Sequence, residues 1–169
     1  MPVNKVVVKK HILETIEKLD RLYNGAPSTE AIYYSKLAII ELCGWIEFSM
    51  DEIAQHFANR KIKTTIYRDI FNGFKNKTYG FDYKTNFRKM LYQTVGLHNM
   101  ESIEVKLERT GQITLLTSEL KNLKTLRDHA AHTYIGATTT YQAPSVTKAQ
   151  LLRIYPILKE IGKEIRTVK

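Results

Sequence analysis

The residues best suited to chemistry lie together in the stretch Arg127-Asp128-His129-Ala130-Ala131-His132-Thr133-Tyr134. Asp128 and His132 are four residues apart, so on a helix they are neighbours on one face. A carboxylate beside an imidazole fixes the tautomer of the ring and favours its protonated form, and a place near a helix C-terminus stabilises the imidazolium further. This combination is typical of a general acid or base that works near neutral pH.

Arg127 places a cation in the middle of an apolar stripe. The other members of the stripe follow helical spacing and are Leu116, Leu120, Leu123, Ala130 and Tyr134. A buried arginine is costly unless it is paired, so Arg127 must meet a carboxylate, a phosphate or the surface of a partner. On an ideal helix Arg127 and His132 lie about 140° apart, too far round to converge on one phosphate. The spacing therefore predicts either an irregular helix or a composite site in which two copies of the motif face each other.

Structural roles are alternatives for the same residues. Arg127 could form a buried salt bridge to Glu41 or Glu47, and His132 could bond a carbonyl group at the end of its helix. His129 and His132 have the i, i+3 spacing of two metal ligands, but no third ligand is evident near them. The sequence therefore predicts neither a metal site nor a cofactor.

The elements that must position these residues read as helices throughout. Apolar residues recur at helical spacing over 6–23 and 32–57, and the second run has only one glycine and no proline. Ser28 is expected to cap the long helix, and further helices are expected around 62–74 and 84–97. Another helix is expected from a cap at Asn99 to about Gly111, and the next from Ser118 to a C′ glycine at Gly136. The last is expected to run from a Thr147-x-x-Gln150 capping box to about Thr167, with a bend at Pro156. The fold class is therefore all-α, an antiparallel helical bundle.

Composition sets the limits of the chain. Its 169 residues suit one domain over 1–169, and 43% hydrophobic with 25% charged residues is ordinary for a globular protein. The single cysteine, Cys43, excludes an internal disulfide and a multi-cysteine zinc site. No apolar run approaches a membrane span, and no signal-peptide core follows the first residues, so no membrane partner and a cytoplasmic location are expected.

Positive charge is concentrated in one part of the chain. The formal net charge is +9, and residues 60–89 hold nine of the 26 basic residues against only two acidic ones. Seven aromatic residues are interleaved with these cations, a pattern that suits unpaired RNA because bases stack and phosphates pair. The alternatives to RNA binding are that the lysines form a solvated face without a ligand and that the aromatic residues belong to the core. The residues predicted to bind RNA are Arg60, Lys61, Lys63, Arg68, Lys75, Lys77, Arg88 and Lys89.

The motif and its helical setting resemble the HEPN superfamily, the higher eukaryote and prokaryote nucleotide-binding domains. The match is Arg127, then the polar Asp128, then His132, near the end of a helical bundle. The extension to Tyr134 fits the Arg-x4-His-x-Tyr form of HEPN toxins that are paired with minimal nucleotidyltransferase antitoxins. Residues 60–111, basic and rich in aromatics, are longer than a minimal HEPN bundle needs and would be an inserted helical segment.

The resemblance implies a metal-independent endoribonuclease, a toxin or defence effector, in which the 2′-hydroxyl of RNA attacks the adjacent phosphate and leaves a 2′,3′-cyclic phosphate. His132 would move protons, Arg127 would stabilise the transition-state charge, and Asp128 would orient or tune them. The family also implies a homodimer with two motifs at its centre, and nucleotidylation of Tyr134 by an antitoxin, unless Tyr134 is a core residue. The alternative is a non-catalytic HEPN module that binds nucleotides or a nucleotidyltransferase.

Overall fold

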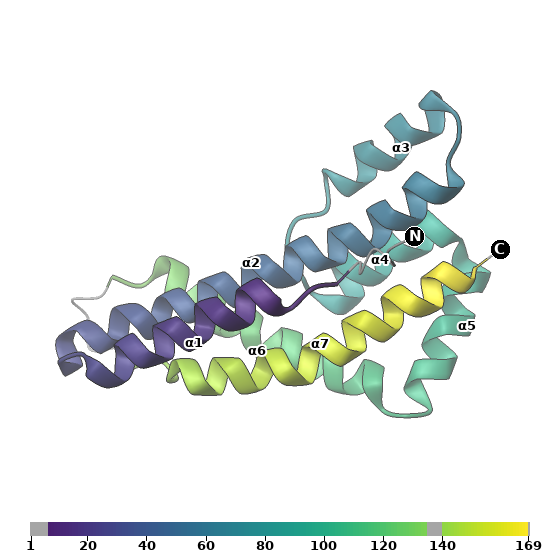
Figure 1. Ribbon diagram of the computed structural model, residues 1–169. Coiled ribbons are helices and arrows are strands. Elements are labelled where there is room, and N and C mark those ends of the chain that lie inside the picture. The colour runs from purple at the N-terminus through teal and green to yellow at the C-terminus, as the bar shows by residue number, and fades with distance from the viewer. Residues whose placement is uncertain (1–6, 135–139, 169) are drawn as a thin grey trace.

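The protein is a bundle of helices, as the sequence predicts (Figure 1). The computed structural model describes residues 7–134 and 140–168, and within these ranges the chain forms helices and connecting turns without a strand. None of the helices is both long enough and apolar enough to cross a membrane. In chain order they are α1 (Lys10–Gly25), α2 (Ser28–Lys61), α3 (Thr65–Lys75), η1 (Tyr83–Phe87, one π-helical turn), α4 (Arg88–Val95), α5 (Leu97–Glu108), α6 (Gln112–His132) and α7 (Pro144–Thr167).

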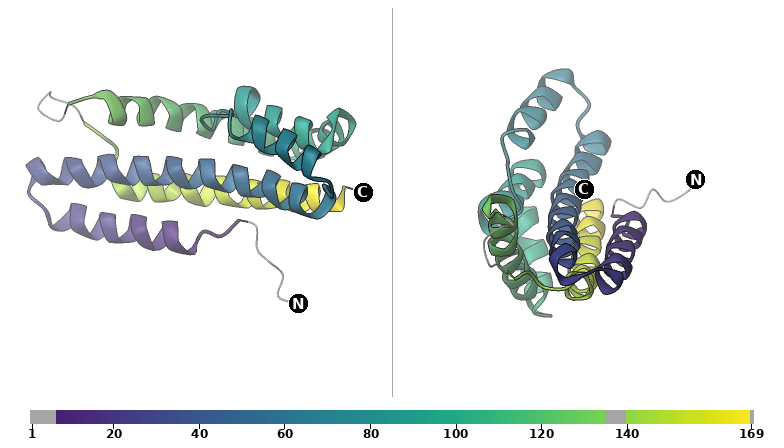
Figure 2. Two further views of the ribbon diagram at one scale, coloured as in Figure 1. Left: turned by 90° about the horizontal axis from the view of Figure 1, so that it is seen from above. Right: turned by 90° about the vertical axis from the view of Figure 1, so that its left-hand side faces the viewer.

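The long helix α2 is the spine of the bundle. It lies between α1 on one side and α6 on the other, with α7 running beside it (Figure 2, left). Because α2 packs against several neighbours, it buries a broad face, which includes Ile39, Leu42, Ile46 and Ile53. The predicted long helix is therefore confirmed, and it extends a few residues beyond the predicted run at each end.

Four helix starts differ from the sequence prediction, which places caps at Ser28, Asn99, Ser118 and Thr147. The cap positions are instead Pro27, Gly96, Gly111 and Ala143, so the first helical residues are Ser28, Leu97, Gln112 and Pro144, and none of these starts has a side-chain cap. A glycine or proline sets each start: Pro27 before α2, Gly96 (φ 87°) before α5, Gly111 (φ 69°) before α6, and Pro144 at the first position of α7. The predicted C′ glycine, Gly136, lies outside the described residues, and the last helical residue before it is His132.

The segment 60–111 contributes to the same hydrophobic core as the long helices. Phe81, Tyr83, Phe87 and Met90 are almost fully buried in it. The π-helical turn η1 is capped by Asp82, whose carboxylate accepts hydrogen bonds from the backbone N–H of Thr85 (2.8 Å) and from its hydroxyl (2.9 Å). Just before this turn, the ring of Phe81 lies close to Arg127 of α6.

Helix α3 stands apart from the rest of the bundle (Figure 1; Figure 2, right). Phe71 is its one buried side chain, and the Phe74 ring lies edge-on to the Phe71 ring at 5.3 Å. Ile66, Tyr67 and Ile70 of the same helix remain exposed. The connection from α3 to η1 then returns the chain to the bundle next to α2.

Candidate functional site

The apolar stripe on α6 is buried at Leu116, Leu120, Leu123 and Ala130, and Arg127 lies between Leu123 and Ala130. Leu116, Leu120 and Leu123 are completely buried, whereas the Arg127 side chain is 33% exposed. The helix ends at His132, so Tyr134 falls outside it and is 83% exposed. Tyr134 is therefore not a core tyrosine, and its hydroxyl is accessible.

Arg127 lines a cavity of about 520 Å³ between α6, α2 and the end of α3. Its buried apolar floor is Met50, Phe87 and Met90. The polar lining residues come from three separate elements and are Glu47 and Asp51 of α2, Lys75 of α3, and Asn76, Thr78 and Tyr79 of the connection that follows α3. The tertiary fold thus surrounds Arg127 with groups that are distant from it in sequence.

The guanidinium of Arg127 makes few contacts within its own chain. Its Nε lies 3.1 Å from Oδ1 of Asp128, and its Cζ lies 5.7 Å from the centre of the Phe81 ring. Nε is nonetheless buried without a hydrogen bond, because the geometry to Asp128 is that of an ion pair and not of a hydrogen bond. The alternative of a buried salt bridge to Glu41 or Glu47 is wrong: Glu41 is exposed, and Arg127 has no ion pair with Glu47.

The carboxylates of the cavity have no partner within the described residues. Glu47 and Asp51 are one helical turn apart on α2, both partly buried, and neither appears in an ion pair or hydrogen bond there. Lys75 instead donates a hydrogen bond from Nζ to Oε1 of Gln55 (2.7 Å). Burial raises the pKa of Asp51, and the charge of Lys75 only partly opposes this. The cavity therefore holds two cations and two carboxylates. Hydrogen-bond donors of Arg127 and acceptors of Glu47 and Asp51 remain unused among the described residues.

Cys43 lies beneath the site and takes no part in nucleophilic chemistry. Its thiol is buried and faces the carbonyl oxygen of Leu123 at 4.0 Å. Burial raises the pKa of Cys43 to about 12, although the positive charge of Arg127 opposes the shift. The thiol is therefore protonated at neutral pH, and thiols react as thiolates.

His132 is exposed at the last position of α6 and does not line the cavity. Asp128 pairs with Arg127, and the described ion pairs include none between Asp128 and His132. The end of the helix is held to α2 by Lys36, which donates from Nζ to the carbonyl oxygen of Thr133 (3.1 Å). A single chain therefore brings Arg127 and Asp128 together but leaves His132 on a different side of the helix, in keeping with the angular separation expected from the sequence.

His129 has a packing role beside the motif. Its ring lies 5.3 Å from the ring of Tyr141, and the Tyr141 hydroxyl donates to the carbonyl oxygen of His129 at 3.4 Å. Across the part of the chain that the structure describes, no three His, Cys, Asp or Glu side chains are grouped as metal ligands.

The basic residues of segment 60–89 divide into two groups. Some are engaged within the chain: Arg88 pairs with Glu104 at 2.7 Å, Lys63 Nζ donates to the Arg60 carbonyl at 2.7 Å, and Arg68 Nε donates to the Ile62 carbonyl at 3.2 Å. The others are Lys75, which belongs to the cavity, and the exposed residues Arg60, Lys61, Lys77, Lys84 and Lys89.

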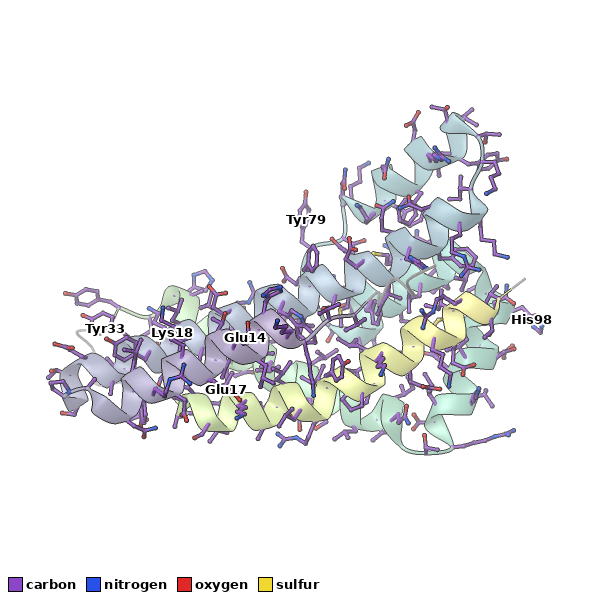
Figure 3. All side chains as sticks on the ribbon, viewed as in Figure 1. Glu14, Glu17, Lys18, Tyr33, Tyr79 and His98 are labelled. Carbon is purple, nitrogen blue, oxygen red and sulfur yellow. The ribbon has the colours of Figure 1, made fainter. Side chains whose placement is uncertain are left out.

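The aromatic residues of this segment divide in the same way. Phe71, Phe81, Tyr83 and Phe87 are core residues, whereas Tyr67 and Tyr79 are exposed. Tyr79 is 81% exposed at the edge of the cavity, and Figure 3 shows its ring projecting away from the bundle. It is the aromatic side chain best placed to stack on a ligand of the cavity.

Sequence reasoning did not assign Glu47, Asp51 or Tyr79 to the site. The signal available for the first two is a pair of acidic residues at i and i+4 within a long helix. Such a spacing indicates one face of the helix, but only the packing of α3 and α6 shows what that face meets.

No protein-family model matches the chain, and neither a curated protein nor a solved structure matches it.

Proposed function

We propose that this protein is a metal-independent endoribonuclease of the HEPN type, built as an antiparallel helical bundle. The observation that carries the proposal is Arg127: it lines a nucleotide-sized cavity, and among the described residues its neighbour Asp128 is its one ion-pair partner. A guanidinium with unused donors is suited to a phosphate group, which it binds through charge-assisted hydrogen bonds. Asp128 keeps the guanidinium oriented toward the cavity.

The reaction we infer is attack of a 2′-hydroxyl on the adjacent phosphate. The new 2′-oxygen–phosphorus bond replaces the bond to the 5′-oxygen, leaving a 2′,3′-cyclic phosphate and a 5′-hydroxyl. A base must take the proton of the 2′-hydroxyl, and an acid must give one to the departing 5′-oxygen; His132 moves these protons. Arg127 stabilises the negative charge that builds up on the phosphorane-like transition state.

The active unit we propose is a homodimer whose twofold axis lies near residues 123–134 of α6. His132 is exposed and does not line the cavity of its own chain, so a second copy is needed to bring an imidazole to Arg127. Lys124, Ala131 and His132 are exposed on this part of the helix, and the small side chain of Ala131 lets another backbone approach closely.

The exposed part of the basic segment would guide the RNA. Arg60, Lys61, Lys77 and Lys89 provide positive charge beside α3 and α4, and Lys75 continues it into the cavity. Contacts of this kind bind the phosphate backbone without reading the sequence, so affinity should fall steeply with salt.

A toxin or defence role follows from the same proposal and concerns Tyr134. Its exposed hydroxyl, two residues after His132, is accessible to a nucleotidyltransferase-type antitoxin. A nucleotidyl group on that oxygen would add bulk and a negative phosphate beside the site and so exclude RNA. Intact mass after co-expression with such an enzyme should show one adduct, absent from Tyr134→Phe; an adduct that persists in this variant would contradict the assignment.

One observation favours a second function, a non-catalytic HEPN module that binds nucleotides or a nucleotidyltransferase. His132 lies outside the cavity, so the cavity could hold a nucleotide without any acid or base.

RNA cleavage by the purified protein in EDTA decides between the two. We expect cleavage to persist in EDTA and to be lost in His132→Ala and in Arg127→Ala with the fold intact. His98→Ala is the matched control, since His98 is exposed at the opposite end of the molecule from the end of α6 (Figure 3). Full activity of His132→Ala would remove His132 from the mechanism, loss of activity in EDTA would indicate a metal enzyme, and binding without cleavage would support the non-catalytic module.

A further inference from the structure

We propose that the Arg127 cavity is a base-specific subsite, which takes the guanine next to the phosphate that is cleaved. In this arrangement Arg127 holds the phosphate at the α6 side, and Glu47 and Asp51 accept hydrogen bonds from the base at the α2 side. The inference rests on the proposed ribonuclease function and adds the identity of the nucleotide that the site selects.

The balance of charge in the cavity excludes a strongly anionic occupant. Lys75 and Arg127 supply two positive charges, and Glu47 and Asp51 supply two negative ones. A triphosphate filling the cavity would meet both carboxylates at short range, and like charges repel strongly where water is limited. A ligand with one anionic group and one neutral, donor-bearing part meets each half of the lining favourably.

The shape and lining of the cavity suit a flat aromatic group. A volume of about 520 Å³ lies within the usual range of small-ligand sites, and Met50, Phe87 and Met90 form an apolar floor. Tyr79 stands at the rim with its ring exposed, so it can stack on a base that enters from outside (Figure 3). Nucleobases combine these needs: an apolar face for stacking and a polar edge for hydrogen bonding.

The acceptors in the cavity select among the four bases. A carboxylate accepts hydrogen bonds only, and the Glu47 and Asp51 carboxylates have no donor partner in the described residues. Guanine presents two adjacent donors on its pairing edge, N1–H and N2–H₂, and can satisfy one carboxylate with two parallel bonds. Adenine and cytosine place an acceptor nitrogen beside their amino donor, and uracil has one N–H between two carbonyl groups. Each of these bases would bring an acceptor against a carboxylate.

The test is the binding of the four nucleoside 3′-monophosphates to the full-length protein, measured by titration calorimetry. We expect guanosine 3′-monophosphate to bind about tenfold or more tightly than the other three. Glu47→Gln and Asp51→Asn should each remove most of that preference, because an amide offers a donor where the base also has one. Glu52→Gln is the matched control, since Glu52 is on the same helix, partly buried, and outside the cavity.

Mapping of the cuts in an unstructured RNA separates this inference from the proposed function. Cleavage with a guanine at one fixed side of each cut supports both. Cleavage at all bases, together with equal binding of the four monophosphates, overturns the guanine subsite and leaves the ribonuclease intact. Guanosine-selective binding without cleavage keeps the subsite and overturns the ribonuclease. If a variant fails to fold by circular dichroism, the four titrations on the wild-type protein still decide.

Discussion

Replacing Arg127 by methionine separates a structural role of this residue from a role in chemistry. Methionine keeps the length and apolar stem of the side chain, and it removes the charge and the hydrogen-bond donors. If Arg127 held the bundle together through a buried salt bridge, removing one partner would cost about 3–5 kcal/mol of unfolding free energy. The two roles therefore predict different losses of stability for the same change.

The contacts in the structure predict a small loss. The ion pair with Asp128 joins side chains that are 33% and 47% exposed, and pairs of this kind contribute about 0.2–1 kcal/mol. The guanidinium over the Phe81 ring, at 5.7 Å, adds about 0.5–1 kcal/mol. Arg127→Met should therefore lower the free energy of unfolding by no more than about 2 kcal/mol. RNA cleavage should fall by about 10²–10³-fold, the usual effect of removing a donor that stabilises transition-state charge.

The measurements are urea unfolding followed by circular dichroism and the initial rate of cleavage of a fluorescent RNA. Arg109→Met is the control, because Arg109 is an exposed arginine after α5, away from the cavity. A loss of stability above about 3 kcal/mol would show that Arg127 is a structural residue after all. An unchanged cleavage rate in a folded variant would remove it from the reaction.

Three further predictions concern other parts of the molecule. Burial raises the pKa of Asp51, so the folded protein holds this proton more tightly than the unfolded chain does. The ionised carboxylate therefore costs stability as the pH rises above about 4. Asp51→Asn should be more stable than wild type at pH 7 in urea unfolding, and an equal gain at pH 3 would contradict this. The buried Tyr83 hydroxyl donates to Glu104 Oε1 at 2.5 Å, so Tyr83→Phe should lose about 1.5–3 kcal/mol, whereas the exposed Tyr33→Phe should be neutral. Light scattering should give twice the 19.6 kDa chain mass, and Ala131→Arg should give monomers without activity; a fully active wild-type monomer would refute the dimer.

The regular part of the fold could be predicted because helical periodicity is a local property. The stripe Leu116, Leu120 and Leu123 on α6 repeats every three or four residues, so the sequence alone indicates which side of the helix is buried. The starts of the helices could not be predicted from caps, because a serine or threonine hydroxyl competes with stronger backbone constraints. Gly111, in the left-handed region, begins α6 well before Ser118, and Pro144 begins α7 before Thr147.

The basic segment shows where periodicity stops being informative. The aromatic residues of this segment all have cations near them in the sequence, so the pattern does not distinguish buried from exposed ones. Phe81 and Tyr83 are buried, whereas Tyr67 and Tyr79 are exposed. Tyr67 lies on α3, which stands apart from the bundle, whereas Phe81 and Tyr83 lie where the chain has returned to it (Figure 1). Burial in this segment therefore follows from packing between helices, which no local pattern predicts.

The sequence by itself determined that the chain is all-helical and that Arg127 is the residue to explain, because a guanidinium on an apolar stripe is visible within one helix. Only the tertiary structure decided what surrounds it. Glu47, Asp51 and Lys75 belong to other helices, and the long-range packing of α2, α3 and α6 brings them to one cavity with Arg127. Their charges leave no mark on the periodicity of α6, since contact between distant segments depends on how whole helices pack and not on the spacing within any one of them.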